Sequence, residues 1–160
     1  MRLAETVRQK LAENFPHSGR HELAIADDKA GWAINLTLDR RDELGCLLWE
    51  LALRRTNPAP AGETLRTWAE RIARQTTGLL EPLKVHEIDE LRNEALLRSE
   101  APSLRKGKRL YYEVLLRGTN LAWLRRYEAD ANGDGKREQV AFALTNDGLA
   151  KLAEDMTAVR

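Results

Sequence analysis

Residues 109–144 read RLYYEVLLRGTNLAWLRRYEADANGDGKREQVAFAL, and this stretch decides the fold. Two turn signals, residues 118–120 (GTN) and residues 130–135 (DANGDG), divide it into three runs of alternating side chains. Alternation with a period of two indicates strands, and short turns containing Gly and Asn join antiparallel neighbours. The stretch therefore predicts a three-stranded antiparallel meander.

The two faces of this predicted meander differ in character. One face is strongly apolar and should bury against helices. The other face mixes charged and apolar side chains, and we assign to it Tyr111, Glu113, Leu115, Leu124 and Arg126. A sheet that is wholly solvated on one side does not normally place Leu and Tyr there, so we expect a second subunit, a partner or one of the chain's own helices to cover part of it. Pairs such as Glu113 with Arg126 would then link neighbouring strands.

The spacing of apolar residues elsewhere in the chain predicts four helices. Apolar residues three and four apart indicate helices over residues 2–14, 39–55 and 63–77, and a closing helix that Thr145 caps. Asp39 would cap the second of these helices. The apolar stripe of that helix would consist of Leu44, Leu47, Leu48 and Leu51.

Alternation also predicts strands outside the meander. Residues 21–38 read as a β-hairpin turned at residues 27–31, and residues 85–89 and 94–99 read as two further strands. The predicted fold class is α+β, with an antiparallel β-sheet (N-terminal hairpin plus C-terminal meander) packed with about four α-helices. We expect one domain over residues 1–160, because this length suits a single core.

Composition limits the classes of function. The chain has 26 Lys+Arg and 25 Asp+Glu, a net charge of +1, so no overall field favours nucleic acid or an anionic membrane. No apolar run approaches the roughly 18 residues that a membrane span needs, and the N-terminus does not read as a signal peptide. Cys46 is the single cysteine, and its apolar surroundings predict a buried, inert thiol. We expect a cytoplasmic protein, and the abundance of Arg, Ala and Leu is typical of a GC-rich bacterial source.

The second turn of the meander is the one short motif with a chemical interpretation. Its oxygen donors stand at relative positions 1, 3, 5, 7 (a backbone carbonyl) and 9, namely Asp130, Asn132, Asp134, Lys136 and Glu138. These nine residues resemble the calcium loops of FG-GAP propeller repeats and the first half of an EF-hand loop. Position 12 is Ala141, not the bidentate Glu of an EF-hand, and the motif has no second copy. The alternative is a plain hairpin turn, since Asn-Gly and Asp-Gly favour such turns. Calcium is the one cofactor that the sequence suggests.

Enzymatic chemistry has weaker support. No nucleophile elbow, phosphate-binding loop, dinucleotide fingerprint or paired-cysteine motif is present in the sequence. A small enzyme would have to assemble its site from His86, Glu87, Glu113 and arginines. His86 and Glu87 are neighbours on a predicted strand and point to opposite faces, so they cannot act together without other groups.

The order of the predicted elements is similar to that of small bacterial secretion chaperones, which dimerise and bind partner peptides. The similarity concerns element order alone, and this chain lacks the acidic charge usual in that family, so the family is not assigned. The leading hypothesis is a non-enzymatic binding or adaptor module that uses the second sheet face to hold a protein partner or a second copy of itself. The alternatives are a small enzyme with a His/Glu/Arg site on the sheet and a domain stabilised by calcium.

Overall fold

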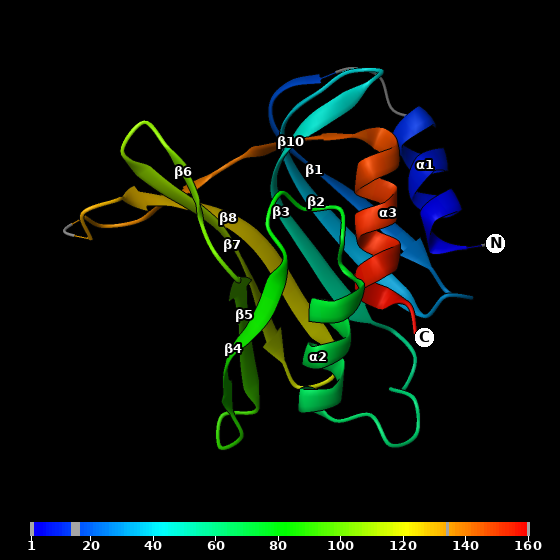
Figure 1. Cartoon of the computed structure of the whole chain (residues 1–160). Coiled ribbons are helices and arrows are strands. Elements are labelled where there is room, and N and C mark those ends of the chain that lie inside the picture. Colours follow the sequence, from blue (N-terminus) through cyan, green and yellow to red (C-terminus); the bar gives the residue numbers. More distant parts are fainter. Residues whose placement is uncertain (1, 14–16, 134, 160) are drawn as a thin grey trace.

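A computed structural model describes residues 2–13, 17–133 and 135–159 and has an α+β fold (Figure 1). Within these residues, one open antiparallel sheet of ten strands is accompanied by three helices. In chain order the elements are α1 (Leu3–Glu13), β1 (His17–Asp27), β2 (Trp32–Arg41), β3 (Gly45–Arg55), α2 (Leu65–Gln75), β4 (Leu83–Asp89), β5 (Glu94–Ser99), β6 (Ser103–Arg105), β7 (Lys108–Arg117), β8 (Leu121–Asp130), β9 (Glu138–Val140), β10 (Phe142–Thr145) and α3 (Asn146–Thr157). The predicted α+β class is confirmed, with three described helices where about four were expected.

The sheet joins the predicted hairpin and the predicted meander through β3. Its main strands lie in the order β1-β2-β3-β8-β7-β5-β4, and the short strands β6, β9 and β10 pair with β7, β8 and β3 respectively. The predicted hairpin is formed by β1 and β2, and the two strands predicted before the meander are β4 and β5. The third strand of the meander is divided at Ala141, because β9 pairs with β8 whereas β10 crosses to β3.

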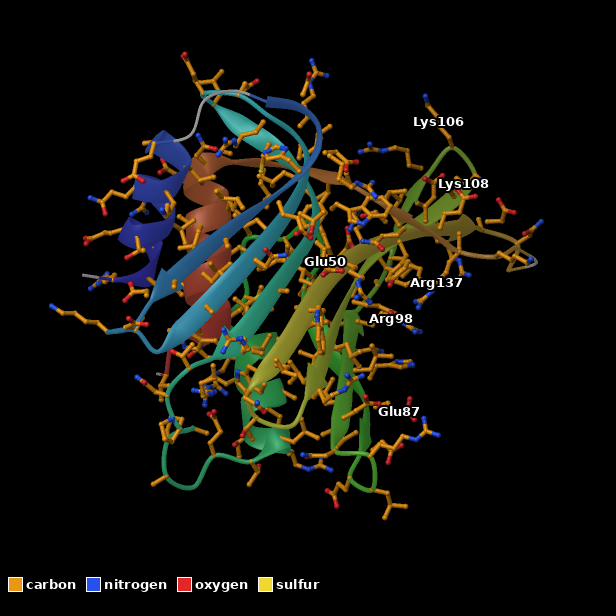
Figure 2. All side chains as sticks on the ribbon, turned by 180° about the vertical axis from the view of Figure 1, so that it is seen from behind. Glu50, Glu87, Arg98, Lys106, Lys108 and Arg137 are labelled. Carbon is orange, nitrogen blue, oxygen red and sulfur yellow. The ribbon has the colours of Figure 1, made fainter. Side chains whose placement is uncertain are left out.

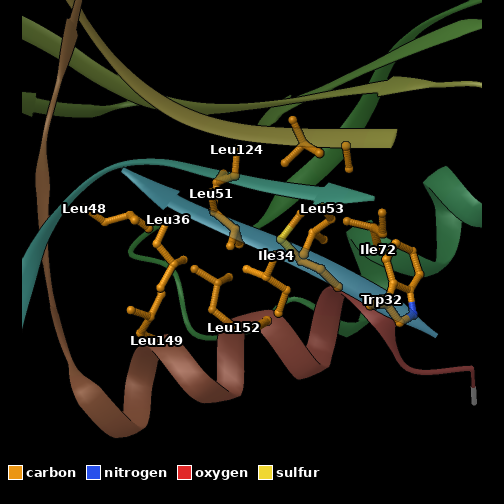
Figure 3. Close-up of a cluster of buried hydrophobic side chains, with 14 of the residues drawn as sticks. Trp32, Ile34, Leu36, Leu48, Leu51, Leu53, Ile72, Leu124, Leu149 and Leu152 are labelled. Carbon is orange, nitrogen blue, oxygen red and sulfur yellow. The ribbon is translucent and has the colours of Figure 1, made fainter. Parts of the chain in front are cut away.

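All three helices lie on one face of the sheet (Figure 1). Leu149 and Leu152 point from α3 toward Leu36 and Ile34 of β2 (Figure 3). Helix α2 packs on the β4, β5 and β7 side, and its Trp68 ring lies 6.0 Å from that of Trp32. Each fully buried large apolar side chain contributes about 1.5–3 kcal/mol through its removal from water. The hydrophobic core therefore lies between this face and the helices.

Side-chain caps fix where two helices begin. Thr64 Oγ1 accepts a hydrogen bond from the backbone N–H of Thr67 at 3.1 Å at the start of α2. Thr145 Oγ1 accepts one from Gly148 N at 2.9 Å at the start of α3, as the sequence predicted. Each cap satisfies an amide that the helix leaves free, and is worth about 1 kcal/mol.

The predicted helix over residues 39–55 is wrong, because this segment contains the hairpin from β2 to β3. Asp39 lies in β2 and pairs with Arg20 instead of capping a helix. The register shifts where Thr37 faces Glu50 but Leu38 faces Leu48, which leaves Trp49 as an extra residue in β3. The buried side chains of β3 are consequently spaced by two, three and two, at Cys46, Leu48, Leu51 and Leu53. A β-bulge thus reproduced the spacing of a helix within a strand.

The same bulge marks the place where β3 changes its neighbour. Residues 51–54 of β3 pair with β8, whereas residues 45–48 pair with β10. Gln139 Nε2 of β9 donates to the carbonyl of Trp49 at 2.8 Å, and the guanidinium of Arg20 lies 3.8 Å from the centre of the Trp49 ring. The sheet therefore forks at Trp49, and side-chain contacts hold the fork.

Candidate binding face

The face of the sheet opposite the helices is open, since no helix in the described part of the chain lies on it (Figure 2). The strand register places one row of residues side by side from β1 across β2, β3, β8 and β7 to β5. That row consists of Ala24, Asn35, Ala52, Trp123, Leu115 and Leu96. All but Asn35 are apolar, and we call the row the apolar stripe. With neighbouring strands about 4.8 Å apart, the stripe is roughly 24 Å long.

Charged residues flank the apolar stripe in a repeated pattern. In β3, β5 and β7, a Glu stands two residues before the stripe residue and an Arg stands two residues after it, in the segments 50–54 (ELALR), 94–98 (EALLR) and 113–117 (EVLLR). The corresponding segment of β8, residues 121–125 (LAWLR), has Leu121 in place of the Glu. Alternate residues of a strand share a face, so Glu, stripe residue and Arg all point to the open side. Our sequence reasoning missed this five-residue repeat, although it can be read without a structure.

Antiparallel pairing turns the repeat into a lattice of ion pairs. Since neighbouring strands run in opposite directions, the Glu end of one segment lies beside the Arg end of the next. The pairs are Arg117 Nε with Glu94 Oε2 at 3.0 Å, Arg98 Nη2 with Glu113 Oε2 at 2.6 Å, and Arg125 Nε with Glu50 Oε2 at 2.8 Å. Surface pairs such as Arg117 with Glu94 add only about 0–1 kcal/mol each, whereas the side chain of Glu113 is 8% exposed. Their main effect is to hold long side chains in place beside the stripe.

A cluster of arginines and tyrosines extends the lattice toward β9. Glu113 Oε2 also accepts Arg137 Nη1 at 2.6 Å, so that two guanidinium groups share one carboxylate. Arg137 lies 3.9 Å from the centre of the Tyr127 ring, and this ring is 6.0 Å from that of Tyr111. Figure 2 shows Arg137 and Arg98 close to each other on this side of the sheet. This part of the face carries more positive than negative charge.

A shallow groove of about 440 Å³ lies over β1, β2, β3 and β8 on the open face. The surface is hollowed here because four of the lining residues have the short side chain of alanine, namely Ala24, Ala26, Ala33 and Ala52. Leu121 and Trp123 form one side, and Arg54 stands at the rim. Grooves lined by apolar groups with a few polar ones are the usual form of binding sites.

The residues predicted for the interaction face do not all lie on one face. Tyr111, Glu113 and Leu115 are on the open face, whereas Leu124 and Arg126 point to the helices. The pairing predicted between Glu113 and Arg126 is wrong, because the register places Glu113 opposite Arg125. A shift of one residue exchanges the two faces of a strand. The structure thus keeps three of the five predicted residues together.

Arg126 belongs instead to a buried polar cluster beneath the sheet. Its Nη1 and Nη2 donate to the two carboxylate oxygens of Glu81 at 3.0 and 3.1 Å. Ser99 and Ser103 donate to the same carboxylate at 2.8 and 2.6 Å. Burial acts to raise the pKa of Glu81, but these hydrogen bonds outweigh it and lower that pKa. Each carboxylate oxygen of Glu81 thus accepts two hydrogen bonds, and the cluster fixes the segment before β4 onto the sheet.

The predicted calcium turn is described only in part, since Asp134 lies outside the described residues. Asp130 Oδ1 accepts Lys108 Nζ at 2.6 Å, and Asn132, Lys136 and Glu138 are exposed. No group of three or more His, Cys, Asp or Glu side chains suited to a metal occurs among the described residues. The ion pair with Lys108 would compete with a cation for the first predicted ligand, and calcium binding stays a prediction.

The residues of the enzymatic alternative are partly brought together. His86 Nε2 lies 3.5 Å from Arg98 Nη1, and Arg98 holds Glu113. Glu87 is exposed on β4. The carboxylate of Glu113 is engaged by the guanidinium groups of Arg98 and Arg137. Cys46 is 7% exposed, and burial raises the pKa of its thiol to about 11, so the thiolate form is scarce at neutral pH.

A cavity of about 780 Å³ lies apart from the open face, beside the end of α3. Its charged lining includes Arg55, whose Nη2 is 2.5 Å from Glu63 Oε2. Glu63 also pairs with Arg71, and the Arg55 guanidinium lies 4.5 Å from the centre of the Trp32 ring. These contacts join the segment before α2 to the sheet and give Arg55 a structural role.

Comparisons with protein-family models, with curated proteins and with solved structures found no match. No helix in the described ranges is both long enough and apolar enough to span a membrane.

Proposed function

We propose that this protein is a non-enzymatic binding module that holds a polypeptide partner across the open face of its sheet. The observation that carries the proposal is the apolar stripe, a row that crosses six strands without a helix over it among the described residues. Apolar side chains in such a row lower the free energy of binding when a partner removes them from water. A small polar substrate would make no use of a row of this length.

The size and composition of the face favour a polypeptide. A length of roughly 24 Å corresponds to about 16 residues of helix or about seven residues of extended chain. The alanine floor of the groove allows another backbone or an apolar side chain to approach closely. Trp123 and the arginines beside it belong to the residue types that dominate binding energy at protein interfaces.

Selection from a library of random dodecapeptides tests this function and requires no named partner. The bait would be the wild-type chain, and the counter-bait would be Ala52→Arg, which fills the groove at the centre of the stripe. We expect peptides that bind the wild-type protein at least about tenfold more tightly than the variant. An equal melting temperature of the two baits would show that the variant is folded. Peptides that bind both baits equally, or an absence of enriched peptides, would contradict the proposal.

A second copy of the chain is the other candidate for the partner. The stripe reaches β1, which pairs only with β2 and so has a free edge in the described structure. Light scattering over a range of protein concentrations separates the two cases. A dimer that Ala52→Arg converts to a monomer would assign the face to self-association, whereas a monomer in both samples leaves a different polypeptide as the occupant.

A further inference from the structure

The lattice of ion pairs on the open face lacks one carboxylate. Three of the four repeated segments begin with Glu, but the segment in β8 begins with Leu121. The register places Leu121 directly between Arg54 of β3 and Arg117 of β7. Every other segment start in this lattice bears a carboxylate that is paired with the Arg of a neighbouring strand. The position of Leu121 is therefore the one break in an otherwise regular pattern of charge.

The two arginines beside Leu121 differ in whether they already hold a carboxylate. Arg117 is paired with Glu94 at 3.0 Å, and its guanidinium lies 5.3 Å from the centre of the Trp123 ring. Arg54 is exposed at the rim of the groove, and within residues 2–13, 17–133 and 135–159 it makes no ion pair or side-chain hydrogen bond. A guanidinium presents a rigid fork of N–H donors that matches a carboxylate. Arg54 thus keeps its full capacity to bind one.

We propose that the bound polypeptide supplies the missing carboxylate, with an Asp or Glu side chain seated over Leu121 between Arg54 and Arg117. This inference rests on the proposed function. The same polypeptide places an apolar side chain next to that acid, in the groove between Ala52 and Trp123. The partner is therefore an acidic and apolar segment, and its acid completes the lattice.

The ion pairs already present on the open face indicate why a carboxylate fits above Leu121. Arg117 already binds Glu94, which stands on the strand on its other side. Arg98 and Arg137 show that two guanidinium groups of this face can share one carboxylate oxygen. A carboxylate above Leu121 repeats that arrangement with Arg54 and Arg117. The low dielectric of the adjacent stripe strengthens the attraction once water is displaced.

The first test repeats the dodecapeptide selection with Arg54→Glu as the bait. Wild-type protein is expected to enrich peptides with Asp or Glu beside an apolar residue. The variant is expected to lose this acidic preference and to bind a wild-type-selected acidic peptide about tenfold more weakly. Arg74→Glu is the matched control, since it makes the same change of charge at an exposed position of α2. This control should select the same peptides as the wild type.

A second test completes the lattice within the chain. Leu121→Glu restores the repeated pattern and offers its own carboxylate to Arg54. We expect its melting temperature to be equal to or above that of the wild type, and its affinity for the acidic peptide to fall at least about fivefold. Gln has nearly the same shape as Glu but no charge, so Leu121→Gln should keep more of the affinity for the acidic peptide than Leu121→Glu. Equal loss in the two variants would overturn the role of charge.

The outcomes separate this inference from the proposed function. Peptides that depend on Ala52 but show no acidic preference would overturn the inference and leave the binding function in place. Peptides that prefer Asp or Glu equally on the wild type and on Arg54→Glu would also overturn it, because the acid would then lie elsewhere. A wild-type bait that enriches no peptide over Ala52→Arg would overturn both.

Discussion

Arg125 and Arg126 are consecutive residues of β8, yet they serve opposite faces of the sheet in very different surroundings. Arg126 binds both oxygens of Glu81, and its side chain is 5% exposed. Arg125 binds one oxygen of Glu50, and its side chain is 33% exposed. A buried charge that loses its partner is costly, whereas water replaces the partner of an exposed charge. The covered face therefore holds the chain together, and the open face presents groups whose contacts can be exchanged for those of a partner.

The largest effect is expected from the buried pair. Arg126→Met leaves the carboxylate of Glu81 without its main partner and should lower the free energy of unfolding by about 3–5 kcal/mol. Urea unfolding followed by circular dichroism measures this loss. The double variant Arg126→Met/Glu81→Leu removes both charges and should recover most of the stability. A single variant that unfolds like the wild type would show that the pair is not a structural link.

The apolar residues of the two faces should differ in the same sense. Leu124 is fully buried beneath the helices, so Leu124→Ala should cost about 2–5 kcal/mol through lost burial and an internal cavity. Leu115 lies on the adjacent strand but on the open face, and Leu115→Ala should cost less than about 1.5 kcal/mol. Thermal unfolding of the two variants gives the comparison. Equal losses would mean that the open face is covered in solution.

Part of the pH dependence of stability should come from Glu81 on the covered face. The pKa of Glu81 is lowered in the folded protein, so its contribution is complete above the unfolded-state value of about 4.3 and is lost as the pH falls through the folded pKa. Urea midpoints measured from pH 7 down to about pH 3 should fall more steeply for the wild type than for Arg126→Met/Glu81→Leu. Parallel curves would assign the acid sensitivity to other carboxylates.

The smallest effect is expected from the partly exposed pair of Arg125 and Glu50. Arg125→Met removes the partner of Glu50 and should change the free energy of unfolding by at most about 1 kcal/mol. The measurement is the same urea titration as for Arg126→Met, and high salt should reduce the difference further. A loss as large as that of the neighbouring arginine would end the distinction between the two faces.

Local periodicity was sufficient to predict most of the elements. The hairpin of β1 and β2, the strands β4 and β5, and the helices α1, α2 and α3 follow from side-chain spacing and from cap residues such as Thr145. Strand β3 was not predictable in this way, because the extra residue Trp49 changes the parity of its buried positions. The Glu81–Arg126 pair joins residues 45 positions apart, and local pattern carries no information on such a pair.

The candidate face was predictable to a smaller extent. The expectation of a mixed face was correct for Leu115, but apolar character alone led to the assignment of Leu124 to the same side. The turn contains the missing information: three residues separate Arg117 from Leu121, which pair with each other, and this pairing places Glu113 opposite Arg125. The repeated Glu and Arg of β3, β5 and β7 then give the same register. Charge pattern and loop length together determine which face of the sheet each β8 residue takes, and hydrophobicity alone leaves that choice open.

The fork at Trp49 also bears on the open face. On the C-terminal side of Trp49, a short ladder joins the β1-β2-β3 half of the sheet to the β8-β7-β5-β4 half. It pairs residues 51–54 of β3 with residues 121–124 of β8. The Arg125–Glu50 ion pair extends this ladder by one residue. At Trp49 and before it, β3 is joined to the β7–β8 arm by the side chain of Gln139 and by the crossing of β10. The apolar stripe crosses the ladder at Ala52 and Trp123. A segment bound along the stripe would therefore contact both halves of the sheet where the fewest residue pairs join neighbouring strands of the main order, and would add a second connection between them.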